Sequence, residues 1–287
     1  MGVLNVQRCK GLGSHFLTGF SDRSREKMEE INEIYKIVRR STSALGGSGY
    51  AGPSYGELTQ GSMQKVLQTL VDKCDLTTES RFLDVGSGLG KPNLHAAVFP
   101  GVAASVGIEC ERLRFQLGML NLSNVLKRRG MPVYFVNGDI EDVISLEPFT
   151  HIYMSDRAFP RRTQKEIARK FNISHSVKIL VSFRPPSLVI EEFGYEVDEV
   201  THVRAYLHGS MEQHTIYVYK RCVATQGGEE AEEQEEKIDP KFAEALERVA
   251  EPTERLLDYA SHEVFLMEMS ERPVRHYKRP RRYAVDL

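Results

Sequence analysis

The sequence contains no tryptophan, no run of 18 apolar residues and no pair of cysteines at CxxC spacing. Without such an apolar run, we expect no membrane-spanning helix, and because the N-terminus lacks the apolar stretch of a secretory signal, we expect no such signal. The four cysteines are scattered, so neither a disulfide framework nor a zinc knuckle is expected, and a reducing compartment fits best. The nine histidines include no HExxH pair, so no metal site is predicted.

The 287 residues are 41% hydrophobic and 27% charged, enough for one sizeable core with appendages. The net charge of -2 hides two charged blocks, six glutamates in 229–236 and six arginines and lysines in 272–282. Such blocks are usually solvated, so they mark boundaries along the chain. The expected parts are an N-terminal helical segment with a lid loop (1–54), a main α/β domain (55–222), an acidic linker (223–239), and a C-terminal helical extension with a basic tail (240–287).

Hydrophobic periodicity predicts helices over 22–40 and 59–73, followed by a regular alternation of strands and helices. The strand candidates are 81–85, 104–108, 132–136, 150–154 and 177–182. The helices between them fit at 91–98, 111–129 and 161–171. This alternation predicts a mostly parallel sheet with helices on both faces.

The rhythm changes near the end of this domain, where residues 195–207 and 213–221 form two strand candidates with a short connection. They predict an antiparallel hairpin added to the parallel sheet. Beyond the acidic block, an apolar helical stripe that begins at Phe242 is interrupted by Pro252 and then resumes. We expect this C-terminal segment to dock on the body of the protein.

The sharpest motif is Asp84-Val-Gly-Ser-Gly-Leu-Gly90, in which three alternate glycines lead from a strand into a helix. Glycine permits positive φ angles and the close approach of a ligand. A nicotinamide-binding turn has the spacing GxGxxG and holds a pyrophosphate, whereas here the spacing is GxGxG and an acid precedes it. That acid would repel a pyrophosphate but attract the amino group of S-adenosylmethionine, which favours the latter cofactor.

Two further acids stand at the ends of the next two strands. Glu109 follows the last glycine of the motif by 19 residues and can accept hydrogen bonds from ribose hydroxyls, and Asp139 could meet an adenine amino group. A merely tight turn would not explain three acids at strand ends. Because ligands of open α/β sheets bind there, we expect one S-adenosylmethionine site lined by Asp84, Gly86, Gly88, Glu109 and Asp139.

An upstream stretch, Tyr50-Ala-Gly-Pro-Ser-Tyr55-Gly-Glu57-Leu-Thr59, has by composition alone the character of a loop with Thr59 capping the next helix. A Tyr-Gly-Glu loop and a short helix that precede the Asp84 strand in this way resemble the disruptor-of-telomeric-silencing family. These are the histone H3 lysine methyltransferases without a SET domain. The later motifs that carry the resemblance are Ile108-Glu109, Gly138-Asp139-Ile140, Ile152–Phe159, Leu180–Pro185 and His214–Arg221. Together they cover about residues 40–221.

The resemblance implies a Rossmann-like, S-adenosylmethionine-dependent methyltransferase fold with seven strands, in which 55–222 is the catalytic domain. It also implies S-adenosylmethionine as cofactor, nucleosomal histone H3 as substrate and the nucleus as location. It adds to the cofactor site the residues Tyr55, Glu57, Thr59, Lys91, Ile140 and Asp156. The walls of its lysine channel would be Tyr50, Tyr55, Asp156, Phe183 and His214. For His214 alone, a satisfied strand histidine is an equal alternative.

Several positions depart from the family's pattern. Its Asn-Asn pair is Ser155-Asp156 here, its glutamine after the glycine turn is Lys91, and its threonine after Tyr-Gly-Glu is Leu58. A tyrosine of its last strand falls near His214. These departures put the cofactor-facing role of Asp156 in doubt and bear on how many methyl groups are added.

Methyl transfer to lysine requires a neutral amine in line with the methyl group, at about 3–3.5 Å from its carbon. The pKa of a free lysine is about 10.4, so an apolar channel that desolvates the amine favours the reactive form. No dedicated catalytic triad is expected.

Other functions are compatible with the same sheet. The chain could methylate RNA, a small molecule or another protein, or it could be a chromatin-binding module with an inactive cofactor site. The basic block could contact nucleosomal DNA or serve as a nuclear-import signal, and its charges are Arg272, Arg275, Lys278, Arg279, Arg281 and Arg282.

Overall fold

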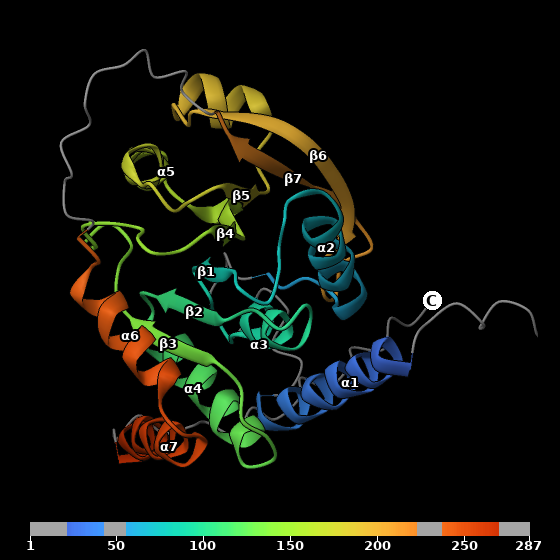
Figure 1. Ribbon diagram of the computed structural model, residues 1–287, viewed down its shortest axis with the longest axis vertical. Coiled ribbons are helices and arrows are strands. Elements are labelled where there is room, and N and C mark those ends of the chain that lie inside the picture. The colour runs from blue at the N-terminus through green and yellow to red at the C-terminus, as the bar shows by residue number, and fades with distance from the viewer. Residues whose placement is uncertain (1–21, 43–55, 223–236, 270–287) are drawn as a thin grey trace, which may run out of the picture.

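The computed structural model describes residues 22–42, 56–222 and 237–269 (Figure 1). The expected lid loop with Tyr50 and Tyr55, most of the acidic linker and the basic tail lie outside these residues. Among the described residues, none of the helices is both long and apolar enough to cross a membrane. The same residues contain no cluster of histidine, cysteine and acidic side chains suited to a metal ion.

A single seven-stranded sheet forms the centre of the molecule, in the order β3-β2-β1-β4-β5-β7-β6. Its strands are β1 (Arg81–Val85), β2 (Ala104–Glu109), β3 (Val133–Asn137), β4 (His151–Met154), β5 (Ile179–Ser182), β6 (Val197–Tyr206) and β7 (Gln213–Arg221). The first five strands pair in parallel, whereas β7 pairs antiparallel to both β5 and β6. The predicted Rossmann-like sheet with a C-terminal antiparallel hairpin is therefore confirmed.

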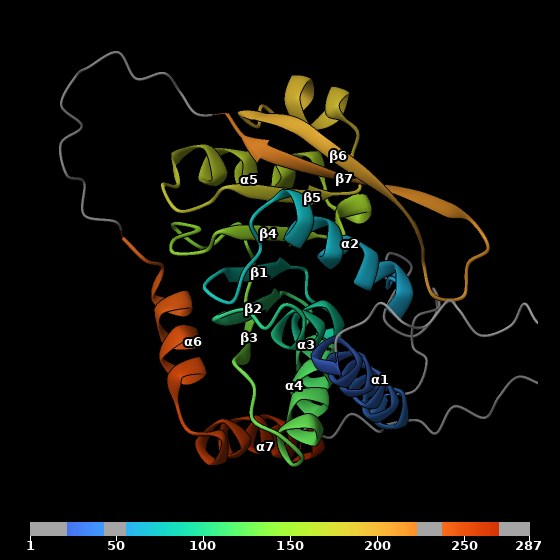
Figure 2. The same ribbon diagram turned by 45° about the vertical axis from the view of Figure 1, so that its right-hand side comes forward.

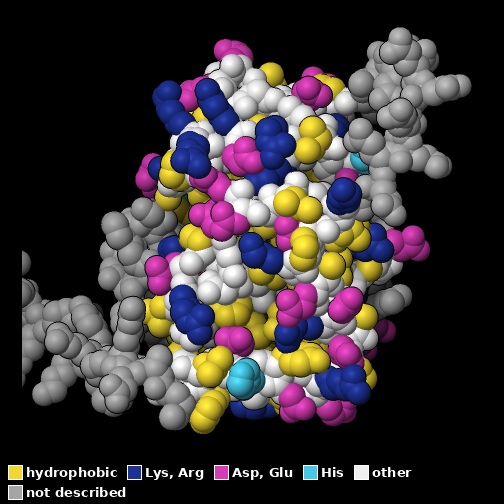
Figure 3. All heavy atoms as spheres, turned by 90° about the vertical axis from the view of Figure 1, so that its left-hand side faces the viewer, with side chains coloured by type: hydrophobic (Ala, Val, Ile, Leu, Met, Phe, Trp, Pro, Cys, Tyr) yellow, Lys and Arg dark blue, Asp and Glu magenta, His cyan; other side chains and the backbone are white. Residues whose placement is uncertain are grey.

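The helices lie on both sides of this sheet, as the alternating pattern predicts. They are α1 (Asp22–Thr42), α2 (Gln60–Lys73), α3 (Lys91–Val98), α4 (Arg112–Leu126), α5 (Arg161–Ile173), α6 (Pro240–Ala250) and α7 (Thr253–Met269). Figures 1 and 2 show α5 and α6 on one side of the sheet and α1, α2 and α3 on the other. On the side of α5 and α6, acidic and basic side chains are interspersed over the surface (Figure 3).

Alternation along the strands divides the core between the two faces, because successive side chains of a strand point in opposite directions. Leu83 packs into the larger hydrophobic cluster, whereas its neighbour Phe82 packs into the cluster that holds Leu67 and Leu70 of α2. All four side chains are completely buried. The sheet is thus covered on both faces and presents its ends, rather than its faces, to a ligand.

The C-terminal extension packs on the body, as expected. Phe242 of α6 is fully buried and meets Phe149 edge to face, with ring centroids 5.0 Å apart. Asp239 caps α6 and also accepts a hydrogen bond of 2.7 Å from the backbone N–H of Ile144. Asp239, at the end of the expected acidic linker, therefore already belongs to the packed body.

Two short helices had no signal in the sequence. They are η1 (Asp156–Ala158), a 3-10 turn after β4, and η2 (Ser187–Glu192), a π-helix after β5. Both are too short for hydrophobic periodicity to register.

Candidate functional site

The glycine turn after β1 has the backbone that its sequence predicts. Gly86, Gly88 and Gly90 have φ angles of 77°, 54° and 79°, in the left-handed region. The N–H of Gly86 donates to the carbonyl of Ile108 at 2.9 Å, which ties the turn to β2. A Cβ at Gly90 would lie 2.1 Å from Cζ of Phe135. Both the dihedral angle and the space therefore require glycine at this position.

Asp84 stands at the start of this turn and is almost completely buried, with 1% of its surface exposed. Its Oδ2 has no hydrogen-bond partner among the described residues. Burial raises the pKa of Asp84 well above its usual value, and the nearby Glu109 raises it further. A buried oxygen without a donor is costly, so this side chain is suited to accept a hydrogen bond from a bound cationic group.

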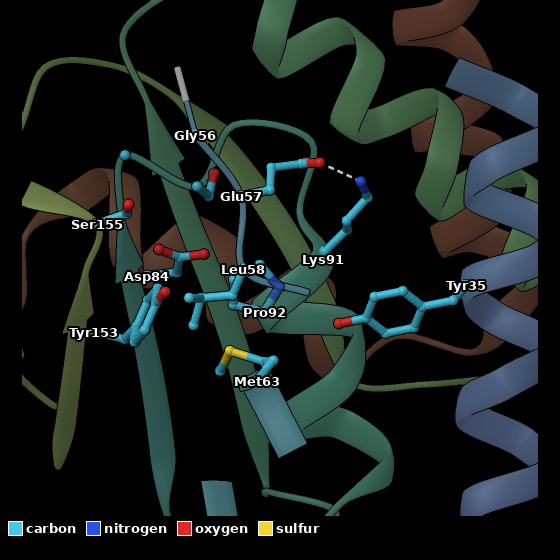
Figure 4. A pocket seen from close by; sticks show the side chains of 12 residues that line it. Tyr35, Gly56, Glu57, Leu58, Met63, Asp84, Lys91, Pro92, Tyr153 and Ser155 are labelled. Carbon is cyan, nitrogen blue, oxygen red and sulfur yellow. Dashed lines mark hydrogen bonds and ion pairs between the residues drawn. The ribbon is translucent and has the colours of Figure 1, made fainter. Parts of the chain in front are cut away.

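A pocket opens at the same edge of the sheet (Figure 4). Its walls come from β1 and the glycine turn, the start of α3, α2 and the segment before it, the end of β4, and α1. The lining residues are Tyr35, Gly56, Glu57, Leu58, Met63, Asp84, Gly86, Ser87, Lys91, Pro92, Tyr153 and Ser155. Of the predicted site residues, the pocket therefore brings together Glu57, Asp84, Gly86 and Lys91.

Glu57 and Lys91 form an ion pair across the pocket (Figure 4). Their side chains are only 8% and 12% exposed, so the pair is largely removed from water. It joins the segment before α2 to the first residue of α3. The neighbouring Thr59 is the N-cap of α2, as predicted, and accepts a hydrogen bond of 3.3 Å from Ser62 N–H.

Glu109 supports the glycine turn from β2. Its Oε2 accepts from the N–H of Gly88 at 2.9 Å, and its Oε1 accepts from the N–H of Glu111 at 2.9 Å and from Nε of Arg114 at 3.2 Å. It is 3% exposed. Because Oε2 has only one of these donors, it retains capacity to accept a second hydrogen bond.

Asp139 and Ile140 follow β3. Asp139 is exposed, and its Oδ1 accepts from the N–H of Glu141 at 2.9 Å. Ile140 is buried, and its carbonyl accepts from Nζ of Lys170 at 2.8 Å. Neither residue lines the pocket around Asp84, so the predicted place of Asp139 against an adenine and of Ile140 in the cofactor site stays a prediction.

Asp156 lies beneath the carboxyl edge of β4 and β5 and is completely buried. Its carboxylate accepts three hydrogen bonds, from Ser182 Oγ at 2.6 Å, Gln164 Nε2 at 2.8 Å and Phe183 N–H at 2.8 Å. Burial raises its pKa, and these hydrogen bonds partly offset that rise. Of the Ser155-Asp156 pair, only Ser155 lines the pocket.

Two further predicted wall residues lie farther along the same edge. Phe183 is 7% exposed and packs in the same cluster as Leu58. His214 is 8% exposed, and its ring lies against Arg157, whose Nη1 is 2.7 Å from Nδ1 and 3.4 Å from Nε2. His214 thus has a hydrogen-bond partner within the chain.

Helix α1 also contributes to the pocket, although no residue of α1 was among the predicted site residues. Tyr35 of α1 lines the pocket, and its hydroxyl lies 3.2 Å from Nδ1 of His95. Nε2 of His95 lies 2.8 Å from Oε1 of Gln64. Burial lowers the pKa of His95 to about 3, so its imidazole is neutral near pH 7, donating from one nitrogen and accepting at the other. Tyr35 was recognisable only as part of an apolar helix stripe.

Residues 48–131 match the family model of the histone methylation protein DOT1. Over this stretch the chain resembles the DOT1 family. The match includes Glu57, Asp84, the three glycines, Lys91 and Glu109, so the predicted resemblance is confirmed there. None of the curated proteins matches the chain in sequence.

Several solved structures are similar at low sequence identity. A candidate RNA methyltransferase, PH1948 from Pyrococcus horikoshii, is 13% identical with a TM-score of 0.48, covering 67% of this chain and 100% of that chain. Magnesium protoporphyrin IX methyltransferase (ChlM) from Synechocystis PCC 6803 with bound SAM is 14% identical with a TM-score of 0.46, covering 71% and 99%. TrmN from Thermus thermophilus is 16% identical with a TM-score of 0.43, covering 64% and 53%. At these identities the likeness concerns the fold alone.

Proposed function

We propose that this chain is an S-adenosylmethionine-dependent methyltransferase that modifies a lysine in the globular core of nucleosomal histone H3. The observation that carries the proposal is the match of residues 48–131 to the histone methylation protein DOT1. That stretch supplies Glu57, Asp84 and Lys91 to the pocket. The stretch that matches the family therefore contains these three lining residues of the pocket.

The residues of the pocket fit this cofactor. The unpartnered Oδ2 of Asp84 is suited to the α-ammonium of its methionine end, and the Lys91 ammonium, which pairs with Glu57 in this structure, carries the charge that its α-carboxylate needs. Glu109 has acceptor capacity left for a ribose hydroxyl. When bound, S-adenosylmethionine supplies a methyl group on a positively charged sulfur.

The task of the chain in this reaction is to orient the cofactor and to keep the acceptor amine neutral. Ser155 lines the pocket, and the buried side chains of Tyr153 and Phe183 supply apolar surface at this edge of the sheet. Desolvation by such surroundings lowers the pKa of a lysine amine and favours its nucleophilic form. The positions of Asp156 and His214 in a lysine channel belong to this proposal, as do those of Tyr50 and Tyr55.

The proposal places the protein in the nucleus, with nucleosomes as its partner. The basic block at residues 272–282 would add contacts to nucleosomal DNA or act as an import signal. The alternatives are methylation of RNA, of a small molecule or of another protein, and an inactive chromatin-binding module.

A comparison of substrates distinguishes these functions. The full chain is incubated with S-adenosylmethionine and, in separate reactions, with nucleosomes, free histones, RNA or buffer, and the conversion of the cofactor is followed. We expect turnover with nucleosomes to exceed turnover with the other three. Turnover with RNA alone would replace the proposal with an RNA methyltransferase, and cofactor binding without any turnover would leave only the binding module.

A further inference from the structure

A cluster of basic side chains lies beside the pocket, at the carboxyl edge of β4 and β5. Arg157 belongs to η1, two residues after the pocket residue Ser155. Arg184 follows β5, and its Nη2 donates to the carbonyl of Arg157 at 2.6 Å. His214 lies at the same edge because β7 runs antiparallel to β5.

This cluster offers hydrogen-bond donors, and the neighbouring carboxylate, Asp156, is completely buried and accepts its hydrogen bonds from Ser182, Gln164 and Phe183. A guanidinium has five N–H donors and no acceptor, so in its contact with Arg157 the ring nitrogen of His214 must accept. Within the described part of the chain, neither Arg157 nor Arg184 forms an ion pair with a carboxylate. Because their charges are not paired with a carboxylate, these two guanidinium groups are suited to bind an anion from outside the chain.

The basic character continues along α5. Between residues 157 and 170 the sequence has six arginines and lysines and one acid, Glu166, and three of these basic residues, Arg162, Arg169 and Lys170, form ion pairs with Glu141 or Glu166. Arg161 and Lys165, one helical turn apart, are both exposed. Arg161 pairs with Glu192, but at 80% exposure such a pair contributes little. The first turn of α5 has no acidic residue and no side-chain cap, so the positive end of its dipole adds to the field.

We propose that this basic rim, defined as Arg157, Arg161, Lys165 and Arg184, binds the phosphate backbone of a nucleic acid next to the candidate active site. Arginine forks match phosphate oxygens in geometry as well as charge. A row of positive charges that extends from the strand edge along a helix fits a chain of phosphates better than one small anion. The rim lies on the packed domain and is distinct from the basic block at residues 272–282.

Salt-dependent binding of a labelled 20-base-pair DNA duplex to the full chain, without S-adenosylmethionine, tests the rim. The test variant is R157Q/K165Q. Its matched control is K127Q/R128Q, which also removes one lysine and one arginine but at the far end of α4, away from the carboxyl edge. All four positions are exposed, so both variants should fold, and equal thermal unfolding temperatures verify this.

Each lost phosphate contact flattens the log–log salt dependence of the binding constant by about 0.9, so two lost contacts give about 1.8. If the variant and the unmodified protein bind equally at 1 M salt, the variant should bind about 60-fold more weakly at 0.1 M salt. The control should keep the slope of the unmodified protein. A single-stranded RNA of equal length is the second probe: loss with both probes assigns the rim to either backbone, and loss with one probe restricts it to that nucleic acid.

The R157K/K165R variant retains both charges and should restore the slope for both probes. An unchanged slope in R157Q/K165Q for both probes would overturn the proposal, and so would an equal loss in the control. Because the measurement omits the cofactor, its failure is independent of the failure of methyl transfer.

Discussion

Replacing Asp84 with asparagine should stabilise the fold and weaken cofactor binding at the same time. The buried carboxylate has an oxygen without a hydrogen-bond partner in the described residues, and leaving such a group unsatisfied costs about 1–3 kcal/mol. Asparagine keeps the shape but removes the charge. At pH 7 we expect the variant to gain about 1 kcal/mol, which for a domain of this size raises the melting temperature by about 3 °C.

The stabilisation should depend on pH in a defined direction. Because the pKa of Asp84 is raised in the folded protein, the wild type loses stability as pH rises from the usual carboxylate pKa towards the raised one. The Asp84→Asn variant does not carry this loss. The difference in melting temperature between the two proteins should therefore be small at pH 4 and should widen towards neutral pH.

Calorimetric titration with S-adenosylmethionine gives the second readout for this variant. A hydrogen bond to a charged group contributes about 1.5–3 kcal/mol, so the affinity should fall by about 10- to 100-fold. The control is Asp142→Asn, because Asp142 is exposed and should change neither quantity. A variant that is less stable than the wild type at pH 7, or that binds the cofactor equally well, would refute the assignment of Asp84.

Two further predictions concern the pocket and its turn. Lys91→Met removes the ammonium that faces the largely buried Glu57 and should lower the free energy of unfolding by about 3 kcal/mol. Adding Glu57→Gln should restore most of this loss. If the two substitutions instead lower the free energy of urea unfolding additively, the pair is not coupled. Gly90→Ala should destabilise the protein by more than about 2 kcal/mol because its φ is 79° and Phe135 fills the space, whereas Gly61→Ala, in helix α2 with no atom within 4 Å of the added Cβ, should stabilise it by about 0.5–1 kcal/mol. Similar effects of the two glycine substitutions on the melting temperature would show that the turn is not constrained.

Local patterns were sufficient to predict most of the fold. The strand that contains Asp84 and the helix after Gly90 have the predicted bounds, Arg81–Val85 and Lys91–Val98. The strand around Glu109 extends one residue farther than predicted, to Glu109 itself. These elements follow from alternating apolar runs and from glycines that only a tight turn explains, and both signals are local in sequence.

The roles of individual side chains were harder to predict because they depend on contacts between distant segments. From the sequence, Asp156 was expected to line the pocket, but its carboxylate accepts hydrogen bonds from Ser182 and Gln164. Tyr35 belongs to an apolar helix stripe, and only the packing of α1 near His95 brings its hydroxyl to the pocket. Hydrophobic periodicity records which side a residue faces and carries no information about its partner.

Mass spectrometry of histones after incubation of the full chain with nucleosomes and S-adenosylmethionine tests the proposed function most directly. We expect methyl-lysine within the globular core of histone H3, with much less of it when the Asp84→Asn variant is used. Methylation confined to a flexible histone tail, or unchanged in the Asp84→Asn variant, would contradict the proposed function.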